Sequence, residues 1–449
     1  MNIYIYILGL LLFLQCQSPE KINTIHLITL DPGHFHSALV QKSMYEKIDP
    51  TVHIYAPDTP DLLLHLKKID DYNSRLEKPT NWNTLTYKGS DYQEKMLYEK
   101  KGNVVMLSGN NQRKTGYILA AIKNGFHVYA DKPLAITSKD FNILKEAFLI
   151  AEKKGLLLYD IMTERSEITT LLQKELSQTE DLFGNLIEGT QDKPAITKES
   201  VHHYYKYVSG KPLIRPAWFF DTEQQGEGIA DVTSHLVDLT FWECFPERTI
   251  TTSDIKLITS KRWPTLISAK DFSRVTGERY FPDYLQKNIV QDSLEVYANG
   301  SINYTIKGHY AKVSVKWEYE AKEGSGDNHF SIMRGTKANL IIEQGVKQNF
   351  TPTLYIKPIR GGFNEASLRK VIDKLQNKYP GISVLKEENK FKIIIPKYLR
   401  EGHEAHFSEV TKRFIKFYED GKIPNWESTN MLTKYWLTTS ALKMAKENK

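Results

Sequence analysis

The feature that most constrains the fold of this chain is an alternation of short apolar runs and amphipathic segments in its first third. Five runs have the length and apolar character of buried strands, at residues 24–30, 51–56, 104–107, 126–130 and 155–159. Four segments between them space their apolar residues as helices do, at residues 36–47, 91–101, 115–123 and 138–154. Because a helix between two strands returns the chain to the same end of a sheet, the alternation favours parallel strands. We therefore predict a doubly wound α/β domain of the Rossmann type at residues 22–160.

One polar segment, residues 70–90, interrupts this pattern. It contains Pro79 and Trp82 and is longer than most connections in compact domains. We expect a loop there, close to a bound cofactor.

The second half of the chain follows a different period. Apolar and polar residues alternate at 293–298, 301–308, 312–319 and 338–343, and Asn299–Gly300 is typical of a hairpin turn. We predict an α+β domain with a large, mostly antiparallel sheet at residues 161–360. A small α+β insert should follow at 361–400, and closing helices at 401–449.

The composition is that of a globular protein with more than one core. The chain has 449 residues, of which 41% are hydrophobic and 25% charged. Its net charge of +6 comes from scattered Lys and Arg residues. Because scattered charge makes no continuous track for phosphates, we expect no nucleic-acid partner.

The N-terminus has the features of an export signal. Residues 3–14 are apolar but too few to span a bilayer comfortably, and Cys16 follows directly. This order resembles a bacterial lipoprotein signal, so we expect a signal peptide at 1–16 and a periplasmic or outer-membrane location through a lipid anchor. A cleaved soluble protein and an uncleaved anchor are the alternatives. Cys244 would then be the only remaining cysteine, which excludes a disulfide framework.

The turn after the first predicted strand departs from the glycine-rich pattern of dinucleotide sites. It reads Asp31-Pro32-Gly33-His34-Phe35-His36 and keeps a single glycine, which still permits a tight turn and a close backbone approach to a pyrophosphate. Candidate cofactor-binding residues here are Asp31, Gly33, His34, Phe35 and His36. We interpret His34 and His36 as hydrogen-bonding residues and expect no metal, because two histidines are too few ligands.

Two further motifs lie about 100 residues apart. The first, at 125–135, reads Gly-Phe-His-Val-Tyr-Ala-Asp-Lys-Pro-Leu-Ala, and the second, at 226–238, reads Gly-Glu-Gly-Ile-Ala-Asp-Val-Thr-Ser-His-Leu-Val-Asp. In a helix, Asp231 and His235 would share one face. Alone, such a pair is more often a simple ion pair, and a Lys-Pro step is more often a loop.

Together and in this order, the motifs resemble those of the glucose–fructose oxidoreductase/inositol dehydrogenase/MocA (Gfo/Idh/MocA) family, in a variant with an extended oxidoreductase C-terminal domain. The resemblance implies that Lys132 lies where the nicotinamide meets the substrate, and that Pro133 follows a cis bond. Asp131 replaces the family's Glu, and Asn110-Asn111 stands where the family has a Pro-Asn turn. The implied cofactor is NAD or NADP, held by these residues as well as by the Asp31–His36 turn.

The chemistry of hydride removal from a secondary alcohol gives each residue a task. His235 would act as the base for the hydroxyl proton, and Asp231 would orient its ring or share the proton. Lys132 would steady the charge on the carbinol oxygen. Candidate substrate-binding residues are Tyr204, Arg215 and Trp218, in segments rich in rings and polar donors (202–207 and 211–218), and Arg165, which the resemblance adds.

Three functions remain open at this stage. The first is an NAD(P)-dependent oxidoreductase acting on a secondary hydroxyl of a sugar or glycoside, with a tightly bound cofactor because an exported enzyme has no free dinucleotide pool. The second is a glycoside-cleaving enzyme that oxidises transiently and eliminates. The third is a non-catalytic, exported carbohydrate-binding protein. In relatives one sheet face makes a dimer contact, so a homo-oligomer is expected.

Overall fold

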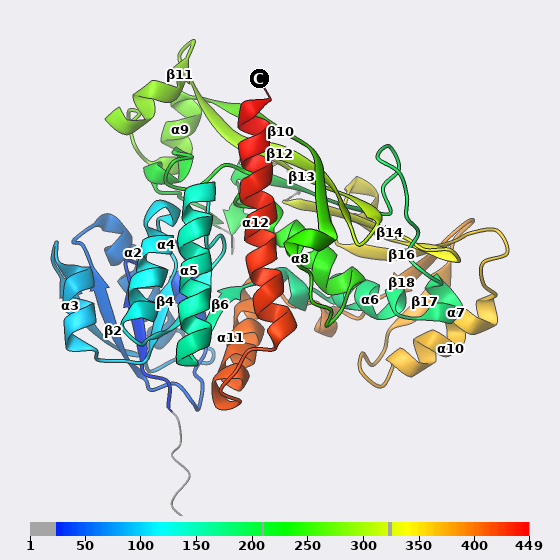
Figure 1. The fold of residues 1–449 in the computed structure, drawn as a ribbon, viewed down its shortest axis with the longest axis horizontal. Helices are drawn as coiled ribbons and strands as arrows, with labels where there is room; N and C mark the ends of the chain where they lie inside the picture. The colour runs from blue at the N-terminus through cyan, green and yellow to red at the C-terminus, as the bar shows by residue number, and fades with distance from the viewer. Residues whose placement is uncertain (1–23, 209–210, 322–325, 449) are drawn as a thin grey trace, which may run out of the picture.

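The computed structural model describes residues 24–208, 211–321 and 326–448, and Figure 1 shows its two domains side by side. The predicted signal peptide at 1–16 and its Cys16 lie outside the described residues. Within the described part, no helix is both long enough and apolar enough to cross a bilayer.

The first domain is built on six parallel strands in the order β3-β2-β1-β4-β5-β6. These are β1 (Leu27–Leu30), β2 (Thr51–Ala56), β3 (Asn83–Lys88), β4 (Val104–Leu107), β5 (His127–Asp131) and β6 (Leu158–Ile161). The helices are α1 (His36–Val40), α2 (Pro60–Ser74), α3 (Tyr92–Glu99), α4 (Asn111–Lys123) and α5 (Ser138–Lys154). Successive strand residues such as Leu27 and Ile28 belong to separate apolar clusters, so both faces are covered. The predicted doubly wound sheet is confirmed.

The predicted loop at 70–90 is wrong at both ends. Helix α2 continues to Ser74, and β3 pairs in parallel with β2 at the edge of the sheet. Four of the six β3 positions are exposed or half-buried polar residues, because an edge strand covers little core. The strand therefore lacks the apolar run that identified the others.

The predicted helix at 36–47 is much shorter in the structure. Helix α1 ends at Val40, and the chain then turns so that Ile48 pairs with Ile25 and Tyr45 enters the core. Tertiary burial of these two side chains takes precedence over the helical spacing.

The second domain contains a sheet in the order β10-β12-β13-β7-β14-β15-β16-β18-β17, antiparallel except between β13 and β7. Its strands are β7 (Ile196–Tyr205), β10 (Ile255–Ser268), β12 (Ser293–Ile306), β13 (His309–Glu320), β14 (Asn328–Arg334), β15 (Ala338–Glu343), β16 (Thr353–Pro358), β17 (Ser383–Lys386) and β18 (Phe391–Ile394). Short β11 (Ile289–Val290) pairs with β12, and β8 (Tyr207–Val208) with β9 (Lys211–Pro212). The predicted large, mostly antiparallel sheet is confirmed.

The helices of the second domain lie against this sheet and along the boundary with the first domain. They are α6 (Ile168–Ser177), α7 (Glu180–Phe183), α8 (Thr233–Cys244), α9 (Ala269–Thr276), α10 (Glu365–Leu375), α11 (His403–Glu419) and α12 (Asn425–Glu447). Short 3-10 turns are η1 (Thr163–Ser166), η2 (Ala217–Phe220), η3 (Thr252–Asp254), η4 (Asp283–Asn288), η5 (Val346–Gln348) and η6 (Lys397–Leu399).

The predicted hairpin turn at Asn299–Gly300 is wrong. Strand β12 runs without a break through both residues and pairs with β10 and β13. The turn lies at Lys307–Gly308, where both residues have positive φ. Gly300 instead serves close packing, because a Cβ there would lie 2.3 Å from Ile229 Cγ1.

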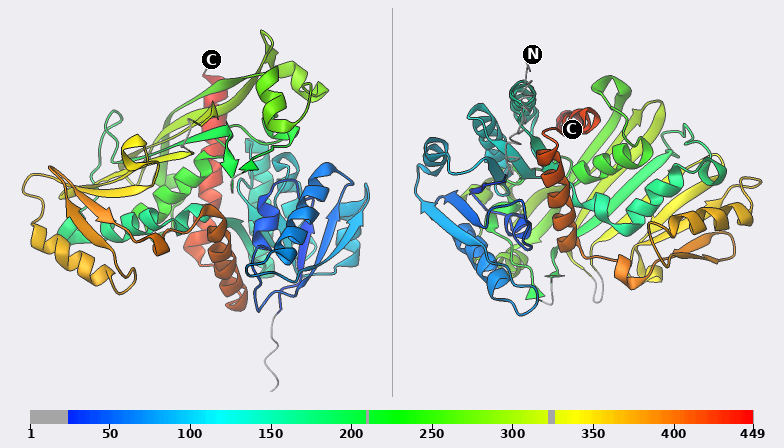
Figure 2. Two further views of the ribbon diagram at one scale, coloured as in Figure 1. Left: turned by 180° about the vertical axis from the view of Figure 1, so that it is seen from behind. Right: turned by 90° about the horizontal axis from the view of Figure 1, so that it is seen from below.

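The last segments join the two domains rather than forming a separate unit. Strand β18 pairs with β16, so the predicted insert at 361–400 extends the main sheet. Figures 1 and 2 show α11 and α12 between the two domains. Lys434 of α12 is fully buried and binds Asp160 of β6 at 2.7 Å and Asp238 of α8 at 2.9 Å.

Candidate active site

A cavity of about 620 Å³ lies at the carboxyl ends of β4 and β5, between the two domains. Nine predicted site residues line it: His34, Phe35, His36, Asn111, Asp131, Lys132, Arg215, Asp231 and His235. Seven do not: Asp31, Gly33, Asn110, Pro133, Arg165, Tyr204 and Trp218. The volume is that of a site for a small molecule.

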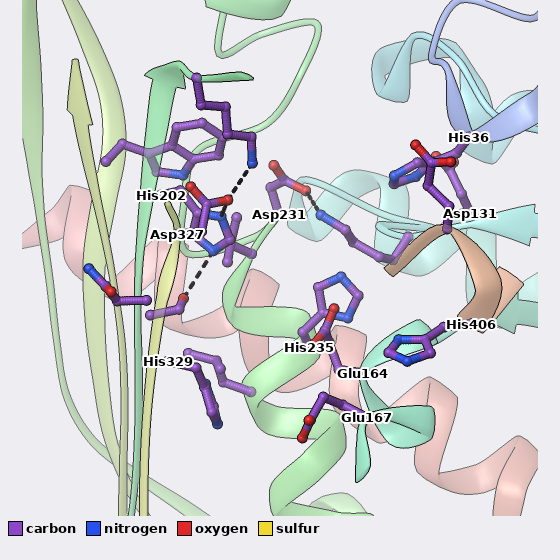
Figure 3. A pocket seen from close by; sticks show the side chains of 18 of the residues that line it. His36, Asp131, Glu164, Glu167, His202, Asp231, His235, Asp327, His329 and His406 are labelled. Atoms are coloured by element: carbon purple, nitrogen blue, oxygen red, sulfur yellow. Dashed lines mark hydrogen bonds and ion pairs between the residues drawn. The ribbon is translucent and has the colours of Figure 1, made fainter. Parts of the chain in front are cut away.

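The three predicted catalytic residues converge in this cavity. The Lys132–Pro133 peptide bond is cis, as the resemblance implied, and Lys132 Nζ donates to Asp231 Oδ1 at 2.6 Å. Gln225 Nε2 donates to the other Asp231 oxygen at 3.0 Å. Asp231 precedes α8, which begins at Thr233, so the pair with His235 spans the start of the helix rather than one regular turn. In Figure 3, Asp231 and His235 both lie in the middle of the pocket, with His235 below Asp231.

Asp131, at the end of β5, is a buried centre of polar contacts on the first-domain side. Its Oδ1 pairs with the buried Lys114, and its Oδ2 lies 3.2 Å from Nδ1 of both His34 and His36 and accepts from Ser108 at 2.9 Å. Burial alone would raise the pKa of Asp131, but Lys114 and the two imidazoles outweigh it and hold that pKa well below its usual range. Burial lowers the pKa of His34, against the effect of Asp131.

The turn after β1 packs closely against Gly109, which follows β4. Gly33 and Gly109 approach so closely that a Cβ on Gly109 would lie 2.4 Å from the Asp31 carbonyl oxygen. The Asp31 carboxylate would oppose a phosphate, but it is paired with Arg113 at 3.3 Å and accepts from Tyr117 at 2.8 Å. A pyrophosphate beside this turn stays a prediction, and the Asp31 charge that would oppose it is already paired.

The region around the β1 turn and the start of α4 is tied to the second domain by several hydrogen bonds. Trp218 Nε1 donates to Asp61 Oδ2 at 2.9 Å, beside Gly33, so its ring contacts the nucleotide domain and does not line the cavity. At the start of α4, Asn110 Nδ2 donates to Gln224 Oε1 at 2.7 Å. Asn111 Nδ2 donates to the Gln225 carbonyl at 2.7 Å. These contacts hold the two sides of the cavity together.

The wall on the sheet side is formed by a second carboxylate centre, Asp327. It binds Nδ1 of His202 at 3.1 Å, Nδ1 of His203 at 3.3 Å, and Lys206. Burial opposes its ionisation, but the histidines and Lys206 hold the pKa of Asp327 far below its usual range. The His202 ring stacks on Trp317 with centroids 5.0 Å apart. The sequence marked the 202–207 segment as polar, but Asp327 had no local signal, because it lies more than 100 residues away.

Two predicted substrate-binding residues have structural partners instead. Arg165 is 2% exposed and forms ion pairs with Asp238 at 2.6 Å and Glu427 at 2.7 Å. Tyr204 is 1% exposed, its ring stacked on Phe220. Neither side chain reaches the cavity, because the core of the second domain takes up both.

Arg215 keeps a place in the cavity wall. Its Nε donates to the Tyr204 carbonyl at 3.0 Å, and its guanidinium lies over the rings of Phe219 and Trp317. Other lining residues that the sequence did not suggest are Glu164, Glu167, His329, Phe350, Arg400 and His406. They come from η1 and the residue after it, from β14, from the segments after β15 and β18, and from α11, which only the fold brings together.

The chain matches one family model and many solved structures. The family described as "Putative oxidoreductase C terminal domain" matches residues 172–446. The crystal structure of a putative oxidoreductase from Parabacteroides merdae is 50% identical, with a TM-score of 0.92 over 95% of this chain and 98% of that one. The search of curated proteins gives no match.

More distant structures share the fold at low identity. Levoglucosan dehydrogenase, solved with NADH and levoglucosan, is 11% identical, with a TM-score of 0.60 over 95% of this chain and 98% of that one. A 3-ketoreductase from Actinomadura kijaniata, solved with NADP and TDP-benzene, is 12% identical, with a TM-score of 0.56 over 94% and 98%. With the cis-Pro motif and the Asp231–His235 pair in place, the chain belongs to the Gfo/Idh/MocA-type oxidoreductases that carry this C-terminal domain.

Proposed function

We propose that this oxidoreductase uses NAD or NADP to oxidise a secondary hydroxyl of a neutral sugar or glycoside, or to reduce the corresponding ketone. The observation that carries the proposal is the 2.6 Å contact between Lys132 Nζ and Asp231 Oδ1 in a cavity that His235 also lines. The dinucleotide chemistry of levoglucosan dehydrogenase and of the 3-ketoreductase, which share the fold, supports it.

Three side chains would carry out the proton and charge work. Lys132, held by Asp231, would donate a hydrogen bond to the reacting oxygen and stabilise its negative charge as the hydroxyl proton leaves. His235 would accept that proton on its imidazole. A bound dinucleotide would accept the hydride on its nicotinamide.

The charges of the cavity wall favour a neutral substrate over an anionic one. Seven carboxylates line it, against four Lys and Arg side chains. Carboxylates accept hydrogen bonds from sugar hydroxyls but repel phosphate and carboxylate groups. Phe350 supplies apolar surface on which the C–H face of a sugar ring can pack.

The direct test is turnover by the purified chain. Neutral mono- and disaccharides, sugar acids and sugar phosphates are supplied with NAD⁺ or NADP⁺, and reduced cofactor and sugar products are measured. We expect reduction with a neutral sugar, lost in Lys132→Met and His235→Gln. Reduction with none of the neutral sugars, or wild-type activity in both Lys132→Met and His235→Gln, would refute the proposal. Release of free sugar from a glycoside without net cofactor reduction would select the oxidation–elimination reaction instead.

Three further proposals concern the protein in its cell. We propose that the chain is exported and lipidated at Cys16, that it retains its dinucleotide through purification, and that it assembles as a homo-oligomer. Mass spectrometry of the N-terminal peptide tests the first, release of nicotinamide on denaturation the second, and light scattering the third. An unmodified Cys16, no released nicotinamide, or a monomer would reject the respective proposal.

A further inference from the structure

Two imidazoles and a hydroxyl converge on one oxygen of the Asp131 carboxylate. Nδ1 of His34 and Nδ1 of His36 each lie 3.2 Å from Oδ2, and Ser108 Oγ lies 2.9 Å from it. The other oxygen, Oδ1, is paired with Lys114. A carboxylate oxygen offers about two lone pairs. Three polar groups therefore converge on Oδ2, and two of them are imidazole nitrogens, which can also act as metal ligands.

The three side chains are spaced closely enough to share one metal ion. Tetrahedral Zn²⁺, with bonds of about 2.0–2.1 Å to nitrogen and about 2.0–2.2 Å to oxygen, holds neighbouring ligand atoms about 3.3–3.5 Å apart. The two observed His–Asp separations are 3.2 Å, at the long end of the range for N–H···O hydrogen bonds. Ligand atoms of all three residues lie within 4.8 Å of one another. Among the described residues, no other three His, Cys, Asp or Glu side chains meet this spacing.

Asp327 on the opposite wall shows what ordinary hydrogen bonding looks like in the same cavity. There, His202 Nδ1 approaches Oδ2, while His203 Nδ1 approaches Oδ1. Each imidazole has its own oxygen, and the two rings do not converge on one point. Convergence is thus particular to Asp131 and is not a general result of placing two histidines beside a buried carboxylate.

We propose that His34, His36 and Asp131 form a binding site for a divalent transition-metal cation, with Zn²⁺ the best match. Two imidazoles and one carboxylate are ligands that Zn²⁺ commonly takes, and three protein ligands leave a fourth position open. All three residues line the cavity, so that position would accept an oxygen of a ligand bound beside Lys132. Lys114 on Oδ1 fixes the carboxylate, as outer partners do at metal sites.

The proposed metal site also explains why the β1 turn carries two histidines. His34 and His36 occupy the stretch that is glycine-rich in ordinary dinucleotide folds. The centroids of their rings lie 4.0 Å apart, and the rings meet edge to face. In the sequence, His34 and His36 stand alone as two ligands, too few to predict a metal. Asp131 supplies the third from the end of β5, 95 residues beyond His36.

The test measures metal on the full chain, purified without a histidine tag, stripped with a chelator, and studied without dinucleotide or substrate. After equilibration with Zn²⁺ we expect about one equivalent per chain, and with Co²⁺ the visible absorption of a tetrahedral site. Because loss of an outer partner alone costs about 10–100-fold in metal affinity, His34→Ala and His36→Ala should each lose at least that. His202→Ala, which removes a histidine from the matched Asp327 centre, should bind as the wild type does.

Two results would overturn the metal site. One is binding well below one equivalent in the wild type, and the other is equal binding in His34→Ala, His36→Ala and His202→Ala. Thermal unfolding in the presence of the chelator checks that each variant is folded. If an alanine variant does not fold, His34→Asn or His36→Asn replaces it in the binding measurement. Since neither dinucleotide nor substrate is present, a negative result leaves the proposed oxidoreductase function standing, and failure of turnover leaves the metal site standing.

Discussion

Lys132 and Asp231 lie 99 residues apart in the sequence and 2.6 Å apart in the cavity wall. Lys132 is 13% exposed and Asp231 7%, so the pair is shielded from solvent but still open to a ligand. An ion pair in this setting places an ammonium group without burying an uncompensated charge. The contact therefore explains how a lysine can be held ready beside a substrate oxygen.

At this scale we expect Lys132→Met to lower kcat by about 10²–10³-fold, the usual cost of losing one donor to a developing oxyanion. KM should change little, because the donor acts mainly in the transition state. Steady-state kinetics with the sugar identified above measure both constants. Lys153→Met, at an exposed position of the same domain, is the control. A rise in KM with kcat unchanged would assign Lys132 to substrate binding only.

Among the elements, α2 shows how a buried histidine can make stability depend on pH. His65 of α2 is 4% exposed, and its Nδ1 lies 2.8 Å from Ser37 Oγ of α1. Burial lowers the pKa of His65 to about 4 from its ordinary value of 6.5. The unfolded chain therefore binds this proton at a higher pH than the folded chain does.

The sign of the effect follows from that lowered pKa. Stability from neutral His65 is complete above pH 6.5 and is lost as pH falls toward 4, by roughly 3 kcal/mol at about 1.4 kcal/mol per pKa unit. His65→Gln removes the titration and keeps a polar partner for Ser37. The free energy of unfolding, measured with urea between pH 7.5 and 4.5, should thus fall more steeply in the wild type than in His65→Gln. Parallel curves would show that His65 does not titrate as its burial implies.

For the whole molecule, α12 is the element that joins the two domains through buried charge. Lys434 lies between Asp160 of the first sheet and Asp238 of α8, and Asp238 also pairs with Arg165. Burial alone would raise the pKa of Asp238, but Arg165 and Lys434 hold it well below its usual value. The network ties β6, α8 and α12 to one another, and α8 carries His235 of the cavity wall.

Removing one member should therefore destabilise the whole chain. Lys434→Met leaves two buried carboxylates without their shared partner, and breaking a buried pair costs about 3–5 kcal/mol. Lys443→Met, on the same helix but 66% exposed, should cost no more than about 0.5 kcal/mol. The free energy of unfolding of each variant, measured with denaturant, tests this difference. Similar losses in the two variants would mean that the network contributes no more than a surface lysine.

The contact between Trp218 and Asp61 spans the domains above Gly33. If the contact between Trp218 and Asp61 closes over a dinucleotide bound at the β1 turn, loss of the contact should speed cofactor release. For Trp218→Phe, which keeps an aromatic ring and removes the donor, we expect about tenfold faster dissociation, corresponding to about 1.4 kcal/mol. Stopped-flow fluorescence of bound reduced cofactor measures the rate. An unchanged rate would place Trp218 outside the path of the cofactor.

The sequence by itself determined the features that depend on local pattern. The strands buried on both faces were recognisable as apolar runs, and the Lys132–Pro133 and Asp231–His235 motifs identified the cavity, because each is a short-range arrangement. Strand β3 was missed since an edge strand needs few apolar residues, and Asn299–Gly300 misled because a glycine required for packing looks like a turn glycine.

The tertiary structure alone decided which side chains meet across long separations. It gave Arg165 to a buried ion-pair network and Tyr204 to the core, brought Asp327 to His202, and set Asp131 between His34 and His36. The physical reason is that burial and electrostatic pairing are properties of a side chain's surroundings, which chain segments from several elements supply together. A local pattern names residues able to perform the chemistry, and packing settles which of them do.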